Sequence, residues 1–531
     1  MRVFLVGLFV VLLAVGAGVW YGVVGQRNLP IEERQFGKNN LLRWDKGEVL
    51  STRLGKVKGL TNGRSSAFLG LPYAEPPLEK LRFMPPVQAS GWQETLDATR
   101  FPPMPMQSES PSFLGDSNQR DTAEDSLYLN IFTPSSSGTS RPVLFWIHGG
   151  SLTHGSANDT DGSILAEQGD VVVVAINYRL GMLGYLDLSS FGDEYAGSAS
   201  NGFRDQIMAL EWVRDNIADY GGDANNVTIF GESAGGLSVL SIIASPQAQG
   251  LFHKAIVNSG GPVHLPPLDQ LSALEKHLGV GSDGLLTKLT SMSANELISA
   301  QEKISFRAGG VDGIVVTQPV DAAIHALGQN GVPIIVGSNK NEGTLFSYLV
   351  PWFLYSLIGE ELAPGNVNGA DPSQYLTRMK KAYPEDNFKQ RFERIWNDRF
   401  RRFALKTAVA ATTAGPGGWL YRFDLEIPDE IGGDWMKATH AAEIQFTFNN
   451  FASDAPANSY LYDKSNPVVV KLAQEWSQRI LAFAKTGNPN LQGLPHWPQY
   501  DATSRQSLVL DENSRIEEFL DKKDREVWGD E

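Results

Sequence analysis

The stretch VTIFGESAGG, residues 227–236, decides the fold and raises the question of what Ser233 does. Its β-branched and apolar residues predict a strand that ends near Phe230, and the small residues after Ser233 predict the start of a buried helix. A strand, a sharp turn and a helix around a serine are typical of a nucleophile elbow, where glycines permit a strained backbone and close packing. The alternative is a glycine-rich loop with an incidental serine, because 53 of the 531 residues are glycine.

Composition limits the chemistry open to this chain. A net charge of −15 and the lack of any Lys/Arg-rich run argue against nucleic acid as a partner. The absence of cysteine excludes disulfides, thiolate catalysis and cysteine-ligated zinc. The eight histidines form no H-E-x-x-H pair, so we predict no metal and no cofactor. A nucleophile must then be a Ser, Thr, Lys or carboxylate side chain.

The N-terminal segment predicts export. Residues 3–26 carry no charged side chain. As a helix they would be about 35 Å long, enough to cross a hydrocarbon core of about 30 Å. We favour an uncleaved anchor with the remaining chain outside or in the periplasm; the alternative is a cleaved signal and a secreted protein. We therefore divide the chain into an anchor or signal (1–27), a linker (28–45) and a single domain (46–531).

The centre of the chain predicts a mostly parallel sheet. Apolar runs that each end in glycine or polar residues are continuous rather than alternating, as in strands covered on both faces. These runs lie at 141–150, 169–181, 226–236, 254–261 and 331–343. The region before them alternates apolar and polar residues, which predicts antiparallel strands at the N-terminal edge. With helical patterns between the runs, we predict an α/β fold with helical insertions near 265–310 and 348–415.

Reactive residues follow several of these predicted strands. Ligands bind beyond the carboxyl ends of the strands in such a sheet. Ser233 follows VTIF, Glu342 follows VPIIVG, and His440 follows GWLYRFDLEIP and a loop. The turn His148-Gly149-Gly150-Ser151 follows PVLFWI. We therefore expect these groups to converge; the alternatives are a solvated turn carboxylate for Glu342 and a loop or cap histidine for His440.

The chemistry that this convergence implies is acyl transfer from an ester. His440 would remove the proton of Ser233 as its oxygen attacks the carbonyl, and Glu342 would orient the imidazole. The order Ser, Glu, His along the chain is that of the α/β-hydrolase layout. The oxyanion needs backbone N–H donors, and we assign that role to Gly150, Ser151 and Ala234.

Other polar residues receive structural interpretations. His148 precedes the glycine turn and His253 leads into a strand, so we predict structural roles for both. Glu232 either positions a water molecule or forms a local hydrogen bond, and the sequence leaves both open. Arg82 and Glu124 are predicted to form a structural ion pair.

Taken together, the residues resemble the type-B carboxylesterase family, the cholinesterase-like branch of the α/β-hydrolases. The resemblance runs from about Gly47 to the C-terminal region and rests on FLGLPYAEPPLEKLRF, AEDSLYLNIFTP, WIHGG, VAINYRLGMLGYL, DQIMALEWVRDNIADYGGDANNVTIFGESAGG and GSNKNEG. It implies the α/β-hydrolase fold and places Ser233, Glu342 and His440 at the triad positions. It also places Gly150, Ser151 and Ala234 in the oxyanion hole.

The sequence departs from the family pattern at three places. Ser151 stands where a third glycine is usual, which narrows the pocket. Ser126 and Pro105 stand at the positions where family members carry a disulfide, so the loop between them is unstapled. No tryptophan occurs between Met106 and Asp125, where cholinesterases hold choline by a cation–π contact, and this argues against a choline esterase.

We therefore predict an exported or membrane-anchored serine carboxylesterase that acts on small to medium uncharged esters. Its partner is a small-molecule ester, its membrane contact is limited to the N-terminal segment, and no oligomeric state is indicated. One alternative is a catalytically inactive, cholinesterase-like adhesion or scaffold protein. Another is a lipase with interfacial activation, in which the loop at 105–126 opens as a lid.

Overall fold

The computed structural model describes residues 44–529, apart from 109–120, 137, 262–269, 305, 310, 352–353, 356–366, 368–370, 430–432, 451–460 and 464. The predicted anchor, and the linker up to residue 43, lie outside the described residues. No helix in the described ranges combines the length and the apolar character needed to cross a membrane. The anchor therefore stays a prediction.

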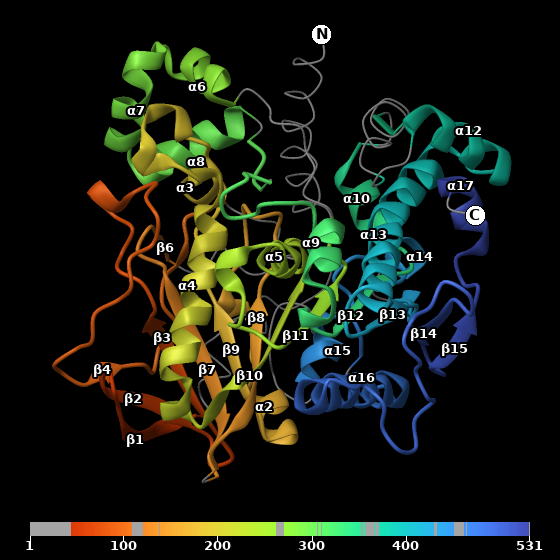
Figure 1. Ribbon diagram of the computed structural model, residues 1–531, viewed down its shortest axis with the longest axis horizontal. Coiled ribbons are helices and arrows are strands. Elements are labelled where there is room, and N and C mark those ends of the chain that lie inside the picture. Colours follow the sequence, from red (N-terminus) through yellow and green to blue (C-terminus); the bar gives the residue numbers. More distant parts are fainter. Residues whose placement is uncertain are drawn as a thin grey trace.

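A single large sheet forms the centre of the molecule, with strand order β1-β2-β3-β7-β9-β8-β10-β11-β12-β13-β14-β15 (Figure 1). Neighbours from β9 to β14 pair in parallel. These strands are β9 (Val172–Ile176), β8 (Arg141–Ile147), β10 (Gly222–Glu232), β11 (Lys254–Asn258), β12 (Ile334–Asn339), β13 (Gly418–Phe423) and β14 (Gln506–Leu510). The five apolar runs predicted β8 to β12, whose apolar residues are buried, and GWLYRFDLEIP predicted β13; β14 was not predicted. The mostly parallel sheet is confirmed.

Both edges of this sheet are antiparallel. At the N-terminal edge, β1 (Asp45–Thr52), β2 (Gly55–Thr61), β3 (Ser65–Pro72) and β7 (Tyr128–Pro134) pair in antiparallel fashion, and β7 joins β9 in the same way. The far edge ends with β15 (Arg515–Glu518), antiparallel to β14. The predicted N-terminal edge strands are thus confirmed.

Helices cover the two faces of the sheet, and the alternation of side chains along β8 shows how. Val143, Phe145 and Ile147 belong to the apolar cluster that includes side chains of α4 (Asn201–Asn216), α5 (Ala234–Ile243), α9 (Val320–Leu327) and α13 (Phe388–Thr413). Leu144 and Trp146 point to the opposite cluster, with α2 (Ser163–Gly169), α15 (Ile444–Phe448) and α16 (Pro467–Thr486). Because both faces are buried, the strand reads as one continuous apolar run.

Helices of the two insertion regions lie apart from each other (Figure 1). The first group comprises α6 (Gln270–Leu278), α7 (Ser282–Ser291) and α8 (Ala294–Lys303), which share a separate apolar cluster with α3 (Gly181–Tyr185). The second group comprises α12 (Pro372–Ala382) and α13, with α10 (Gly343–Leu349) just before it in the chain and packed on α13. The C-terminal helix α17 (Lys522–Trp528) packs on α12.

The predicted ion pair between Arg82 and Glu124 is confirmed, and both side chains are nearly buried. Arg82 also donates through Nη1 to the carbonyl oxygen of Met292, 2.6 Å away, just after α7. Near the same place β5 (Met104–Pro105) and β6 (Thr122–Ala123) form a two-residue bridge. The described ends of the loop that lacks a disulfide are therefore held together by backbone pairing.

Candidate active site

Ser233 occupies a strained turn between β10 and α5. Its backbone has φ 56° and ψ −119°, a conformation that non-glycine residues rarely adopt. The flanking glycines are required by space: a Cβ on Gly235 would stand 2.0 Å from the carbonyl oxygen of Ile147, and one on Gly231 would stand 2.5 Å from the Gly235 carbonyl carbon. The helix therefore packs directly on the strand ends, as expected of a nucleophile elbow.

His440 and Glu342 are joined by a short hydrogen bond. Nδ1 of His440 lies 2.5 Å from Oε2 of Glu342, and the carboxylate is fully buried. Its second oxygen, Oε1, accepts from the Ser259 hydroxyl at 2.6 Å and from the Asn339 N–H at 2.7 Å. Because both oxygens are engaged, the carboxylate has one orientation.

Ser259 and Asn339 were missed by the sequence analysis. A signal was available, because Ser259 directly follows β11 and Asn339 ends β12, at the strand ends from which a site was expected. Asn339 also donates through Nδ2 to the Thr439 carbonyl and to Oε2 of Glu443, each at 2.6 Å. One asparagine thus contacts Glu342 and the segment that carries His440.

The other nitrogen of the imidazole faces Glu232. Nε2 of His440 lies 3.3 Å from Oε1 of Glu232. The position of a Cβ on Gly149 would be 3.0 Å from Oε2 of Glu232 and 3.2 Å from Cβ of Ser233, so these two side chains lie beside each other. Within the described residues, no hydrogen bond joins the Ser233 hydroxyl to His440. Among the described residues Oε1 of Glu232 has no hydrogen-bond partner, so both roles left open for Glu232 stay predictions.

Three buried carboxylates and one imidazole share this space. Burial alone would lower the pKa of His440, but the charges of Glu232 and Glu342 and the bond to Glu342 raise it to about 9. Burial raises the pKa of Glu232 to about 8. Burial and the charge of Glu342 raise the pKa of Glu443 to about 7. The protonation of each of these groups therefore depends on that of the others.

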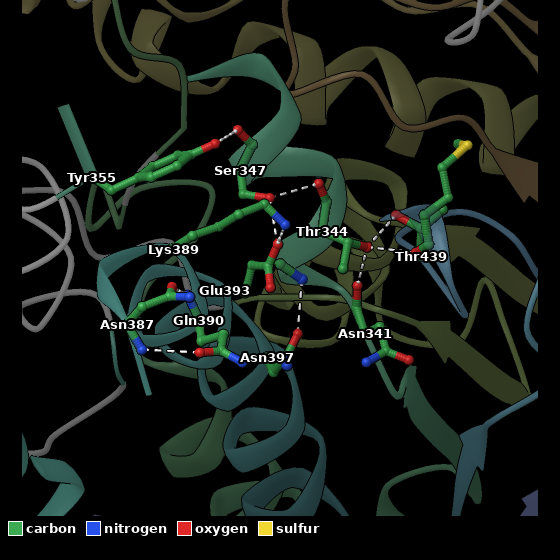
Figure 2. Close-up of polar contacts among 12 residues, drawn as sticks. Asn341, Thr344, Ser347, Tyr355, Asn387, Lys389, Gln390, Glu393, Asn397 and Thr439 are labelled. Carbon is green, nitrogen blue, oxygen red and sulfur yellow. Dashed lines mark hydrogen bonds and ion pairs between the residues drawn. The ribbon is translucent and has the colours of Figure 1, made fainter. Parts of the chain in front are cut away.

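The segments that carry Glu342 and His440 are fixed to each other and to α13, as Figure 2 shows. The Thr344 hydroxyl lies 2.9 Å from the Thr439 hydroxyl and 2.7 Å from the Met436 carbonyl. The Gly343 N–H donates to Oδ1 of Asn397 at 2.7 Å. A Cβ on Gly343 would stand 2.1 Å from the Glu393 carbonyl oxygen, so only glycine fits there. These contacts fix the position of Glu342 relative to His440.

The turn after β8 has an unusual backbone. Gly150, Ser151 and Leu152 have φ values of 99°, 58° and 59°. Within the described part of the chain, the N–H groups of Gly150 and Ser151 have no acceptor. The Ser233 N–H donates to the Asn258 carbonyl at 2.9 Å, so the next N–H, that of Ala234 at the start of α5, is the first one after the turn that remains free for a ligand.

Aromatic rings enclose the imidazole. The ring centres of Phe400 and Phe346 lie 4.9 Å and 5.3 Å from that of His440. Phe346 in turn stacks on Trp396, with centres 4.0 Å apart. None of these aromatic residues was singled out from the sequence. Trp396 and Phe400 lie in the predicted insertion at 348–415 and Phe346 just before it, where the pattern is least informative.

The remaining histidines near the sheet take part in local contacts. His148 stacks on Tyr178 with ring centres 4.4 Å apart, and its Nδ1 donates to the Gly149 carbonyl at 2.9 Å. His253 accepts from the Val227 N–H at 3.1 Å. Over the described residues, no group of three or more His, Cys, Asp or Glu side chains is arranged to hold a metal ion.

A mostly parallel sheet with a strained serine turn and a buried Glu–His pair at its edge defines an α/β-hydrolase. The chain belongs to the carboxylesterase family, which matches residues 46–528. Its relatives are named as esterases, and it is an enzyme that hydrolyses carboxylic esters.

Two relatives and two solved structures illustrate the match. The chain is 33% identical to para-nitrobenzyl esterase of Bacillus subtilis, over 90% of this chain and 98% of that protein. It is 35% identical to human cocaine esterase, over 86% of this chain and 85% of that protein. The structure of a PNB esterase matches with a TM-score of 0.79 at 30% identity, covering 91% and 99% of the two chains. A Geobacillus stearothermophilus carboxylesterase matches with a TM-score of 0.77 at 34% identity, covering 90% and 99%.

Proposed function

We propose that the enzyme is a serine esterase that works through an acyl-enzyme intermediate, with Ser233 as nucleophile, His440 as general base and acid, and Glu342 as the group that orients the imidazole. The observation that carries this proposal is the 2.5 Å bond between His440 Nδ1 and a fully buried Glu342, beside a strained Ser233. With Nδ1 committed to Glu342, Nε2 is the nitrogen left to exchange a proton with the serine.

In the first half-reaction, Nε2 of His440 accepts the Ser233 proton while Oγ bonds to the ester carbonyl carbon. The resulting oxyanion would be stabilised by the N–H groups of Gly150, Ser151 and Ala234. Collapse of the intermediate breaks the bond to the alcohol oxygen, which leaves with the proton from His440. Water then repeats the sequence on the acyl-enzyme and releases the acid.

We also propose a role for Glu232, which lies beside Nε2 of His440. In the free enzyme Nε2 lies near Glu232, so the imidazole must turn slightly, or the serine rotamer must change, for the proton transfer to Ser233. Catalytic hydrogen bonds often tighten only when substrate is bound. Glu232 would then stabilise the protonated imidazole by its charge.

The test is hydrolysis of p-nitrophenyl butyrate together with labelling by a fluorophosphonate, in the unaltered enzyme and in Ser233→Ala. Ser241→Ala is a matched control, because Ser241 lies on α5 and its hydroxyl only donates to the Leu237 carbonyl at 3.0 Å. We expect activity and labelling to vanish in Ser233→Ala and to persist in Ser241→Ala. Labelling that persists in Ser233→Ala would overturn the assignment.

The finer expectations are tested by the same preparation. A folded chain that neither labels nor hydrolyses any ester would favour the adhesion or scaffold alternative. A rate increase on p-nitrophenyl palmitate above its solubility limit would favour a lipase. We also propose that residues 46–531 form one catalytic domain and that the protein is exported and anchored. Fractionation of cells that express the full chain would test the localisation.

A further inference from the structure

Two arginine side chains, Arg399 and Arg307, have no counter-ion among the residues that the structure describes. Arg399 on α13 and Arg307 in the loop after α8 are both partly buried. Among the described residues, neither guanidinium forms an ion pair or a hydrogen bond, and Nε of Arg399 is buried without any partner. A cation that is withdrawn from water without a partner is costly. The chain has 60 acidic and 45 basic residues, so carboxylates to pair with are in excess.

Arg399 is connected to the imidazole of His440 through two aromatic rings, those of Trp396 and Phe346. Its chain neighbour Phe400 packs on His440, and Trp396, one helical turn before it, stacks on Phe346, which also packs on His440. The position of a Cβ on Gly261 would be 3.6 Å from Nε of Arg399. Gly261 is two residues after Ser259, whose hydroxyl binds Glu342. Arg399 therefore faces the loop that supports the acid of the site.

A second donor without a partner lies on the same face of α13. Nε1 of Trp396 is buried and has no hydrogen-bond acceptor among the described residues. Trp396 and Arg399 are three positions apart, so they are neighbours on the helix surface. The guanidinium carbon of Arg399 lies 5.2 Å from the centre of a Trp396 ring. Two buried N–H donors that have no acceptor in the described part of the chain make this face suited to an anion.

Arg307 adds positive charge to the same region. Burial, together with the charge of Arg307, lowers the pKa of Arg399 to about 10, so the two cations lie close enough to repel each other. Burial also lowers the pKa of Arg307. The backbone of Arg307 is fixed, because its carbonyl accepts from Nε2 of Gln270 at 2.8 Å, at the start of α6. A bound anion would relieve both the repulsion and the desolvation.

We propose that Arg399 and Arg307 bind a carboxylate group of the substrate, so that the enzyme prefers acidic esters such as half-esters of short dicarboxylic acids. This inference rests on the proposed esterase function and revises the expectation of uncharged substrates. A guanidinium pairs with a carboxylate through two parallel hydrogen bonds, which gives orientation as well as affinity. The acidic group would lie several bonds from the scissile carbonyl, since two rings, Trp396 and Phe346, lie between Arg399 and His440.

The experiment compares kcat/KM for p-nitrophenyl hydrogen adipate and for its uncharged methyl ester, p-nitrophenyl methyl adipate. A second pair, the butyrate ester of 4-hydroxybutanoate and its methyl ester, places the charge on the alcohol side and is followed by titration of released acid. The variants are Arg399→Met and Arg307→Met. Arg214→Met is the control for loss of one positive charge, because Arg214 lies on α4, is half exposed and pairs with its neighbour Asp215.

We expect the enzyme to favour one charged ester over its methyl ester by at least about ten-fold, a preference typical of a charge-assisted contact. Arg399→Met should abolish the preference while it leaves the neutral ester within about three-fold. Arg307→Met should reduce the preference, and Arg214→Met should not change it. The pair of esters that shows the effect tells whether the carboxylate belongs to the acyl or to the alcohol part.

Two results would overturn the inference. One is the absence of any preference for either charged ester in the unaltered enzyme. The other is an equal loss on charged and neutral esters in Arg399→Met, which would make Arg399 a packing residue. Binding of adipate to the Ser233→Ala variant, measured by calorimetry and lost when Arg399→Met is added, tests the anion site without catalysis. Failure of the esterase proposal would thus be distinguished from failure of this one.

Discussion

The hydroxyl oxygens of Thr344 and Thr439 lie 2.9 Å apart, so a hydrogen bond connects the residue two positions after Glu342 with the residue just before His440 (Figure 2). The two segments are separated by almost a hundred residues in the chain and meet only through tertiary contacts. The position of the acid relative to the imidazole therefore depends on hydroxyl groups that take no part in the chemistry.

We expect Thr344→Val to lower kcat by about ten- to a hundred-fold with little change in KM, because small displacements of catalytic groups are costly. Steady-state kinetics with p-nitrophenyl butyrate is the measurement. Thr412→Val is the control, since Thr412 is a partly buried threonine on α13 that bonds only to carbonyls near the far end of that helix. An unchanged kcat in Thr344→Val would show that the other contacts suffice.

The fold and the proposed site residues stand out in the sequence for the same reason. Strands covered on both faces must be apolar throughout, which makes β8, β9 and β11 visible as runs. Few polar residues and turns directly follow such runs. Ser233, Glu342 and the glycine turn after β8 are among them. Local pattern therefore carries most of the information about this part of the molecule.

Features that depend on side-chain direction were not predictable. The contact between His440 Nε2 and Glu232 depends on rotamers, and the sequence left two roles for Glu232 open. Arg399 and Arg307, whose charges affect each other, lie about ninety residues apart in the two insertion regions, where no periodic pattern marks the inward face. Only the packing of Phe400 on His440 shows that the segment of α13 with Arg399 lies beside the site.

The pH dependence of hydrolysis should respond to Glu232. His440 must be neutral to accept the serine proton, and the negative charge of Glu232 raises its pKa. Burial raises the pKa of Glu232 to about 8, so Glu232 takes up a proton below that pH and no longer raises the pKa of His440. The two groups therefore titrate together. We expect Glu232→Gln to move the acidic half-maximum of kcat/KM to a pH lower by about 1.

The matched control for this profile is Glu211→Gln, which removes one negative charge from the surface of α4. Its kcat/KM profile should overlay that of the unaltered enzyme. A Glu232→Gln profile that keeps its midpoint and only loses amplitude would mean that Glu232 positions a group and does not tune the imidazole. Profiles from pH 5 to 10 at constant ionic strength make the distinction.

The Arg82–Glu124 pair should stabilise the first insertion. Arg82 joins Glu124 to the carbonyl of Met292, and both charged side chains are about one-tenth exposed. Arg82→Met leaves Glu124 without its partner in a place poorly reached by water, at a cost of about 3 kcal/mol. We expect a lower Tm and faster proteolytic cleavage near residues 282–303. Lys80→Met, an exposed charge two residues away, should change neither quantity; an unaltered cleavage rate in Arg82→Met would contradict the role.

A buried acid near the C-terminal helix should limit stability at neutral pH. Burial, and then the charge of Asp524 on α17, raise the pKa of Asp398 well above its usual value. The folded state therefore binds a proton that the unfolded state releases, so stability falls as pH rises above the unfolded pKa of about 4. Asp398→Asn can still accept from the Tyr375 hydroxyl, which lies 2.6 Å from Oδ2. We expect this variant to raise Tm by about 1–3 °C at pH 8 and to leave it unchanged at pH 4.

Asp386→Asn, which weakens the ion pair with Arg394, should instead lower Tm at pH 8. Equal Tm values for Asp398→Asn and the unaltered enzyme at pH 8 would show that the Asp398 carboxylate is compensated by its surroundings.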